Sequence, residues 1–160
     1  MMREQISFTE IEYLQRRKTT KREAFLREMD RIVPWEDCVR CVQAVYPKGE
    51  RGRKPISVET MLRMYLLQTW FNASAKGIEE AIYDSFAMKQ FMRIRFDAEQ
   101  VPDATTLRKF RKLLEKNGLQ NQILQLVHSA LKTAHKTVRP GSIADAAVLK
   151  TPLKRIEGDR

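Results

Sequence analysis

The basic residues between positions 103 and 118 are the first candidates for chemistry in this sequence. Helical spacing of about 100° per residue gathers Leu107, Phe110 and Leu114 on one side of a helix. The segment Gly77 to Phe86, which precedes this helix, has no basic residue, and such segregation of charge is typical of a helix-turn-helix unit that presents a recognition helix to DNA. A solvated helix face without a ligand is the alternative interpretation. The side opposite the apolar one carries the candidate DNA-binding residues Thr105, Arg108, Lys109, Lys112 and Lys116.

Two further basic clusters could add contacts to DNA phosphates. One runs from Arg16 to Arg22, and the other is a loop from Lys48 to Pro55 that contains two glycines. Glycine lets the main chain approach a phosphate closely, and guanidinium groups bind phosphate in a forked geometry. In the loop we predict that Arg51, Arg53 and Lys54 bind the DNA backbone.

The overall composition favours a polyanionic partner. Thirty Lys and Arg against 20 Asp and Glu leave a net charge of +10, and the pI is about 9.9. Such a surplus attracts nucleic acid or anionic lipid. No apolar run approaches the roughly 18 residues of a membrane span, and the segment Met1 to Glu10 has carboxylates where a signal peptide needs apolar residues. We therefore expect a cytoplasmic protein without a membrane partner.

The cysteines and histidines favour structural roles. Cys38 and Cys41 form a C-x-x-C motif, but the sequence has no second cysteine pair to complete a zinc site. Their spacing places both thiols on an apolar helix face, so we interpret them as buried structural cysteines. His128 and His135 lie two helical turns apart, and we expect them at the surface or in an interface.

Asp145 interrupts an otherwise apolar run of strand length, Ile143 to Leu149. A carboxylate in a buried strand is costly unless a cation meets it. Two interpretations remain open at this point: a ligand for a divalent metal, or an edge-strand residue that faces water.

The elements that must position these residues are helices. We predict an all-α bundle with one short terminal strand, divided into an N-terminal arm (1–17), a helical DNA-binding domain (18–137) and the start of a second domain (138–160). The central helix is expected over 58–71, where the sequence is apolar almost all round. The others are expected at about 20–32 with a Thr20/Glu23 capping box, from Pro34 to near Tyr46, within 77–86, as a turn or short helix near 88–92, at 104–117 between a cap at Asp103 and a stop at Gly118, and at about 119–136.

Five blocks of the sequence carry a family resemblance. They are TKREAFLREMDRIVPWEDC, YPKGERGRKPISVETMLRMYLLQTWFN, EEAIYDSFAMKQF, VPDATTLRKFRKLLE and GSIADAAVL. Together they resemble the amino-terminal part of transposases of the bacterial insertion-sequence-five family. The resemblance runs in order from about Phe8 to Leu149, nearly the whole chain.

The resemblance implies a helical domain that binds the terminal inverted repeats of the element, followed by an RNase-H-like catalytic domain. In that family two Asp and one Glu hold two Mg²⁺ ions for strand cleavage and transfer. The family motif V-D-A-T-I-I corresponds to Ile143 to Leu149, so Asp145 would be the first catalytic acid and a metal ligand. The stretch Thr151 to Arg160 departs from the family pattern, and the second Asp and the Glu are missing. Because two-metal chemistry needs several converging carboxylates, we predict that this chain alone holds no Mg²⁺ cofactor and does not cut DNA.

The residues and the resemblance together predict the double-stranded-DNA-binding domain of a transposase, associated with the bacterial nucleoid. We expect the terminal strand to be frayed or paired with a second copy, which would make a homodimer. The alternative function is a helical interaction or dimerisation module whose charge serves only solubility or non-specific polyanion binding.

Overall fold

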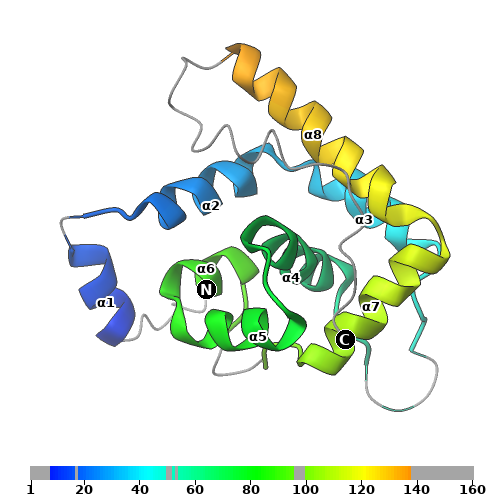
Figure 1. The fold of residues 1–160 in the computed structure, drawn as a ribbon. Coiled ribbons are helices and arrows are strands. Elements are labelled where there is room, and N and C mark those ends of the chain that lie inside the picture. Colours follow the sequence, from blue (N-terminus) through cyan, green and yellow to red (C-terminus); the bar gives the residue numbers. More distant parts are fainter. Residues whose placement is uncertain (1–7, 17, 50–51, 53, 96–99, 138–160) are drawn as a thin grey trace, which may run out of the picture.

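The computed structural model of the 160-residue chain describes residues 8–16, 18–49, 52, 54–95 and 100–137. Every regular element in this part of the chain is an α-helix, which confirms the predicted all-α fold (Figure 1). Among these residues no helix is both long enough and apolar enough to cross a bilayer. The eight helices are α1 (Phe8–Gln15), α2 (Lys21–Ile32), α3 (Trp35–Gln43), α4 (Val58–Phe71), α5 (Ala75–Asp84), α6 (Phe86–Met92), α7 (Ala104–Lys116) and α8 (Leu119–Thr137).

Helix α4 forms the centre of the bundle, as its uniformly apolar sequence predicts. Helices α3, α5, α6 and α7 all pack against it. Val58 and every residue from 61 to 69 are buried. A helix that is apolar all round loses contact with water only when neighbours surround it, so the other helices arrange themselves about α4.

Helix α8 closes one side of the bundle. It contacts α2, α3 and α7, and Figure 1 shows it along the outer edge of the molecule. Only Asn117 and Gly118 separate it from α7. Gly118 has a φ of +64°, a left-handed conformation that glycine adopts without steric cost, so the predicted stop after α7 is confirmed.

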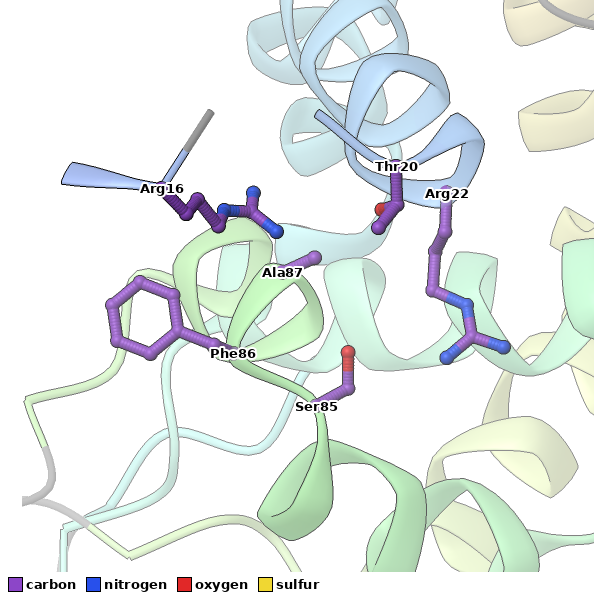
Figure 2. Close-up of a pocket in the computed structure, with 6 residues that line it drawn as sticks. All are labelled: Arg16, Thr20, Arg22, Ser85, Phe86 and Ala87. Carbon is purple, nitrogen blue, oxygen red and sulfur yellow. The ribbon is translucent and has the colours of Figure 1, made fainter. Parts of the chain in front are cut away.

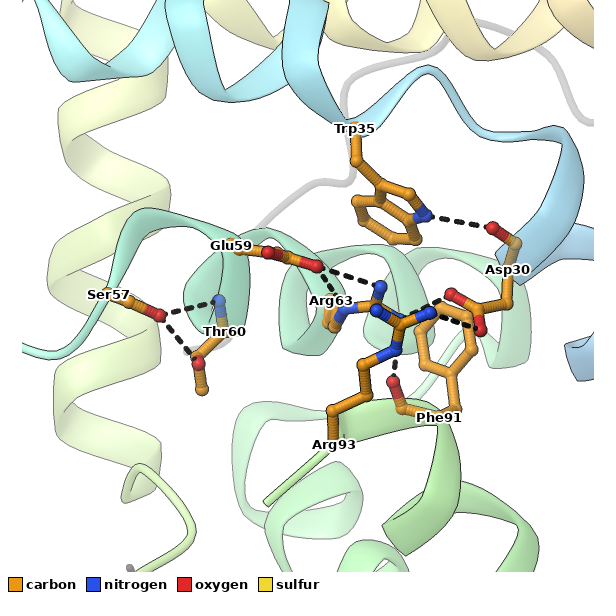
Figure 3. Close-up of polar contacts among 8 residues, drawn as sticks. All are labelled: Asp30, Trp35, Ser57, Glu59, Thr60, Arg63, Phe91 and Arg93. Atoms are coloured by element: carbon orange, nitrogen blue, oxygen red, sulfur yellow. Dashed lines mark hydrogen bonds and ion pairs between the residues drawn. The ribbon is translucent and has the colours of Figure 1, made fainter. Parts of the chain in front are cut away.

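A buried arginine joins four helices near one end of α4. The side chain of Arg63 is 1% exposed, and its guanidinium binds a carboxylate oxygen of Glu59 at 2.9 Å and one of Asp30 at 2.8 Å (Figure 3). It also donates to the carbonyl oxygen of Phe91 at 2.7 Å and lies 4.1 Å from the ring centroid of Trp35. Arg93 approaches the second oxygen of Asp30 at 3.1 Å. The cation is therefore fully compensated, as a buried charge must be.

The helix starts follow the predicted caps with two differences. The Thr20 hydroxyl accepts from the Glu23 amide at 3.1 Å, but the Glu23 carboxylate binds Arg16 and Arg27, so the reciprocal half of the predicted capping box is replaced by ion pairs. Pro34 is the N-cap of α3 and not its first residue.

The predicted N-terminal arm contains a helix that the sequence analysis did not identify. Helix α1 leaves two apolar side chains in solvent, Phe8 at 79% exposure and Ile11 at 40%. The predicted terminal strand and the predicted second domain from 138 onward lie outside the described residues, as do Asp145 and its predicted metal site.

Candidate nucleic-acid interface

Helix α7 carries the candidate interface, and its first turn is fixed by two carboxylates. Asp103 is the N-cap and accepts from the Thr106 amide at 2.7 Å. The hydrogen bonds from Thr106 hold the pKa of the Asp103 carboxyl below its usual value, with Lys109 and Lys76 contributing. Glu79 of α5 accepts from the Ala104 amide at 3.0 Å. Two backbone amides at the start of α7 therefore have hydrogen-bond acceptors. The acceptor for the Ala104 amide comes from another helix, α5.

The inner face of α7 is anchored in the core. Leu107 and Leu114 are fully buried and Phe110 is 4% exposed. The ring of Phe110 lies 6.3 Å from that of Tyr65 on α4 and 6.2 Å from that of Tyr46, which follows α3. Each such side chain contributes about 1.5–3 kcal/mol through burial, so the rotation of α7 about its axis is fixed by its apolar residues.

Because the inner face is fixed, the opposite face must point to solvent. The structure places all five α7 residues that were predicted to bind DNA on this exposed face: Thr105, Arg108, Lys109, Lys112 and Lys116. We call these five residues the α7 cationic face. The predicted segregation of an apolar and a cationic side is therefore present in the folded helix.

Arg111, which lies on the same helix, belongs to the other side. It is half-buried, and with the amide of Gln68 turned by 180° its Nη1 donates to the Gln68 oxygen at 3.2 Å. Its charge also acts on Tyr65, whose pKa is raised by burial and lowered in part by Arg111. Arg111 therefore holds α7 to α4 and is oriented away from the α7 cationic face.

The basic loop after α3 starts next to α7. The Tyr46 hydroxyl donates to the Ile56 carbonyl oxygen at 2.5 Å, which ties the two ends of the loop together. A Cβ built on Gly49 would lie 2.5 Å from Cδ of Pro55, so the backbone approaches closely there and requires glycine. The contact between Tyr46 and Phe110 brings this loop and α7 to the same end of the bundle (Figure 1). Lys54 is exposed, whereas Arg51 and Arg53 lie outside the described residues.

The third basic cluster does not join this surface. Lys18, Lys21 and Arg22 lie at the start of α2, and Figure 1 shows that end of α2 on the opposite side of the molecule from α7. The structure therefore unites two of the basic stretches and separates the third.

The predicted helix-turn-helix unit depends on how the helix before α7 is connected to it. Helix α5 does pack against α7, but α6 lies between them in the chain, so the short connection of a helix-turn-helix is absent from this described pair.

Cys38 is buried as predicted, and burial raises the pKa of its thiol to about 12. Cys41 is only half-buried, and its sulfur accepts from Gln122 at 3.3 Å. Within the described residues, no three His, Cys, Asp or Glu side chains cluster as metal ligands would.

Two residues have structural roles that the sequence did not predict, Glu79 at the start of α7 and Arg63 in the centre of the bundle. Glu79 lies in the segment from Gly77 to Phe86, which was noted only for its lack of basic residues, and Arg63 lies within an apolar run where no pattern assigned it a partner. The single sequence signal for Glu79 was its place on the acidic helix before α7, and nothing local indicated which amide it would meet.

The sequence matches the profile of a family described as Transposase domain (DUF772) over residues 12–113. This segment extends from α1 to the third turn of α7 and includes the basic loop. Since the match covers more than half of the chain, the protein belongs to the transposase domain family DUF772. No solved structure matches the chain.

Proposed function

We propose that this helical domain binds double-stranded DNA, and that its specific target is the terminal inverted repeat of the element that encodes it. The observation that carries the proposal is the α7 cationic face, which has one hydroxyl and four cationic groups beside a single exposed carboxylate, Glu115, on a helix whose opposite side is locked into the core. A helix held in this way presents its side chains in a fixed register, which reading a groove requires.

Within this face the roles divide by chemistry. Thr105 and Arg108 lie in the first turns of α7, where a recognition helix contacts base edges, and Arg108 has the forked geometry that suits guanine. Lys109, Lys112 and Lys116 are point charges suited to phosphate oxygens. Arg51, Arg53 and Lys54 extend the phosphate contacts along the strand from the neighbouring loop.

Membership of the transposase domain family supports a role in transposition, and the resemblance to the insertion-sequence-five family extends the proposal. In it, Asp145 is the first of the acids that hold Mg²⁺ in the full-length family, where the metal supplies activation of water and stabilisation of the developing charge on phosphate. The present chain contributes the DNA-binding half of that activity.

The test is a fluorescence-anisotropy titration with the inverted-repeat duplex and with a shuffled duplex of the same composition. We expect at least a tenfold preference for the inverted repeat. Arg108→Glu and Lys112→Glu should each weaken binding by about ten- to one-hundredfold, since a lost base or phosphate contact costs about 1–3 kcal/mol.

Lys132→Glu is the matched control, because Lys132 is an exposed lysine on α8 and its reversal changes the net charge by the same amount. It should leave the preference intact. Equal affinity for both duplexes, or equal losses in all three variants, would favour the interaction module with non-specific polyanion binding.

A further inference from the structure

Two arginines line a cleft at the start of α2, which is separate from the α7 cationic face. Its volume is about 340 Å³, and it lies between the segment leading into α2 and the start of α6. Figure 2 shows Arg16 and Arg22 reaching from the α2 side towards Ser85 and Ala87. The described residues that line it are Arg16, Thr20, Arg22, Ser85, Phe86 and Ala87, and none of them is acidic.

We infer that this cleft is a second DNA-backbone site, so that one copy of the domain contacts two duplex segments. The inference rests on the proposed function, because the ligand is the same, but it concerns a different surface.

The charge of the cluster is not cancelled locally. Between positions 16 and 27 the sequence has six basic residues and a single carboxylate, Glu23. The side chain of Glu23 is 3% exposed and pairs with Arg16 and with Arg27, the latter at 2.6 Å. This buried carboxylate fixes Arg16 at the rim of the cleft while leaving an excess of positive charge there. Among the described residues no carboxylate forms an ion pair with Arg22, whose guanidinium lies 5.4 Å from the centroid of the Phe71 ring.

The hydroxyl groups of Thr20 and Ser85, which line the cleft, can each donate a hydrogen bond. Thr20 accepts from the Glu23 amide at 3.1 Å, and Ser85 accepts from the Met88 amide at 3.3 Å. Since both oxygens act as acceptors in these caps, their O–H protons remain able to point into the cleft. Two guanidinium groups and two hydroxyl donors facing one opening are the complement of a phosphodiester.

The cleft and the α7 cationic face lie on different sides of the bundle. In Figure 1 the first turn of α2 and helix α7 lie on opposite sides of α4. We therefore assign a separate duplex segment to each of the two surfaces.

The test is native mass spectrometry of the full chain with an excess of a 12-base-pair duplex at low ionic strength. The wild-type protein should form complexes of one chain with one duplex and of one chain with two duplexes. Arg22→Glu should reduce the two-duplex complex at least tenfold and leave the one-duplex complex. Lys18→Glu with Lys21→Glu provides a second variant, because both lysines are exposed and a carboxylate near the start of α2 favours the helix.

The outcomes separate the two proposals. Lys132→Glu on α8 should keep the two-duplex complex, and Arg108→Glu with Lys112→Glu should remove one duplex by disabling the other surface. A wild-type chain that binds only one duplex, or a two-duplex complex that survives both Arg22→Glu and the Lys18/Lys21 double variant beside the cleft, would overturn the second site. A two-duplex complex that persists in the α7 double variant but is lost in Arg22→Glu would instead contradict the role of α7 and leave the cleft supported.

Discussion

Replacement of Arg63 by alanine tests whether the buried polar cluster holds the bundle together. The side chain of Arg63 is 1% exposed, whereas those of its partners Asp30 and Glu59 are 28% and 44% exposed. Removal of one member of a buried ion pair costs about 3–5 kcal/mol. Both carboxylates can regain water and Asp30 retains Arg93, so we expect the lower end of that range, about 3 kcal/mol.

Differential scanning calorimetry measures this loss as a fall in Tm. For a chain of this size about 1 kcal/mol corresponds to roughly 2–4 °C, so Arg63→Ala should lower Tm by about 6–12 °C. Arg63→Met should lose only about half as much, because the thioether chain fills most of the volume next to Trp35 and Phe91.

The control is Arg40→Ala on α3. The side chains of Arg40 and Asp37 are 76% and 54% exposed and their ion pair is 3.4 Å long, so its loss should cost less than about 0.5 kcal/mol. The reasoning is refuted if Arg63→Ala shifts Tm no more than Arg40→Ala does, or if the methionine variant is as unstable as the alanine variant.

Further predictions concern the start and end of α7 and the thiols. Glu79→Ala should destabilise the fold by about 1–2 kcal/mol in urea titrations by leaving the Ala104 amide unpaired, whereas Glu79→Gln keeps an acceptor and should lose clearly less. Asp103→Ala should cost about 1 kcal/mol at pH 7. Because the folded pKa of Asp103 is lowered, its ionic contribution is present above the usual pKa of 3.8 and is lost as pH falls through the folded value, so thermal melts of wild type and Asp103→Asn should converge as the pH falls below 3.8. Gly118→Ala should cost about 1–2 kcal/mol through its positive φ alone, since a Cβ there meets no atom within 4 Å, and Gly118→Asn should recover part of this loss in the same melts. Iodoacetamide at pH 8 should label Cys41 and spare Cys38 until denaturant is added, and peptide mass spectrometry would show the reverse order if Cys38 were the exposed thiol.

The local sequence determined most of the helices and the orientation of α7. The caps at Thr20 and Asp103 and the stop at Gly118 are short-range signals, because each acts on backbone groups within a few residues. The apolar spacing on α7 also determined which of its residues face water. The DNA target of those residues remains a prediction, since it depends on a ligand and not on the helix pattern.

Only the tertiary structure decided which distant residues meet. Glu79 finds the Ala104 amide and Arg63 finds Asp30 because packing around α4 brings separate helices together, and no periodicity along the chain specifies those partners. The same packing placed the basic loop beside α7 and the 16–22 cluster on the far side, a separation that net charge and sequence spacing do not encode. Local signals set the direction of each side chain relative to its own helix, whereas the relative positions of the helices follow from how their apolar faces bury one another.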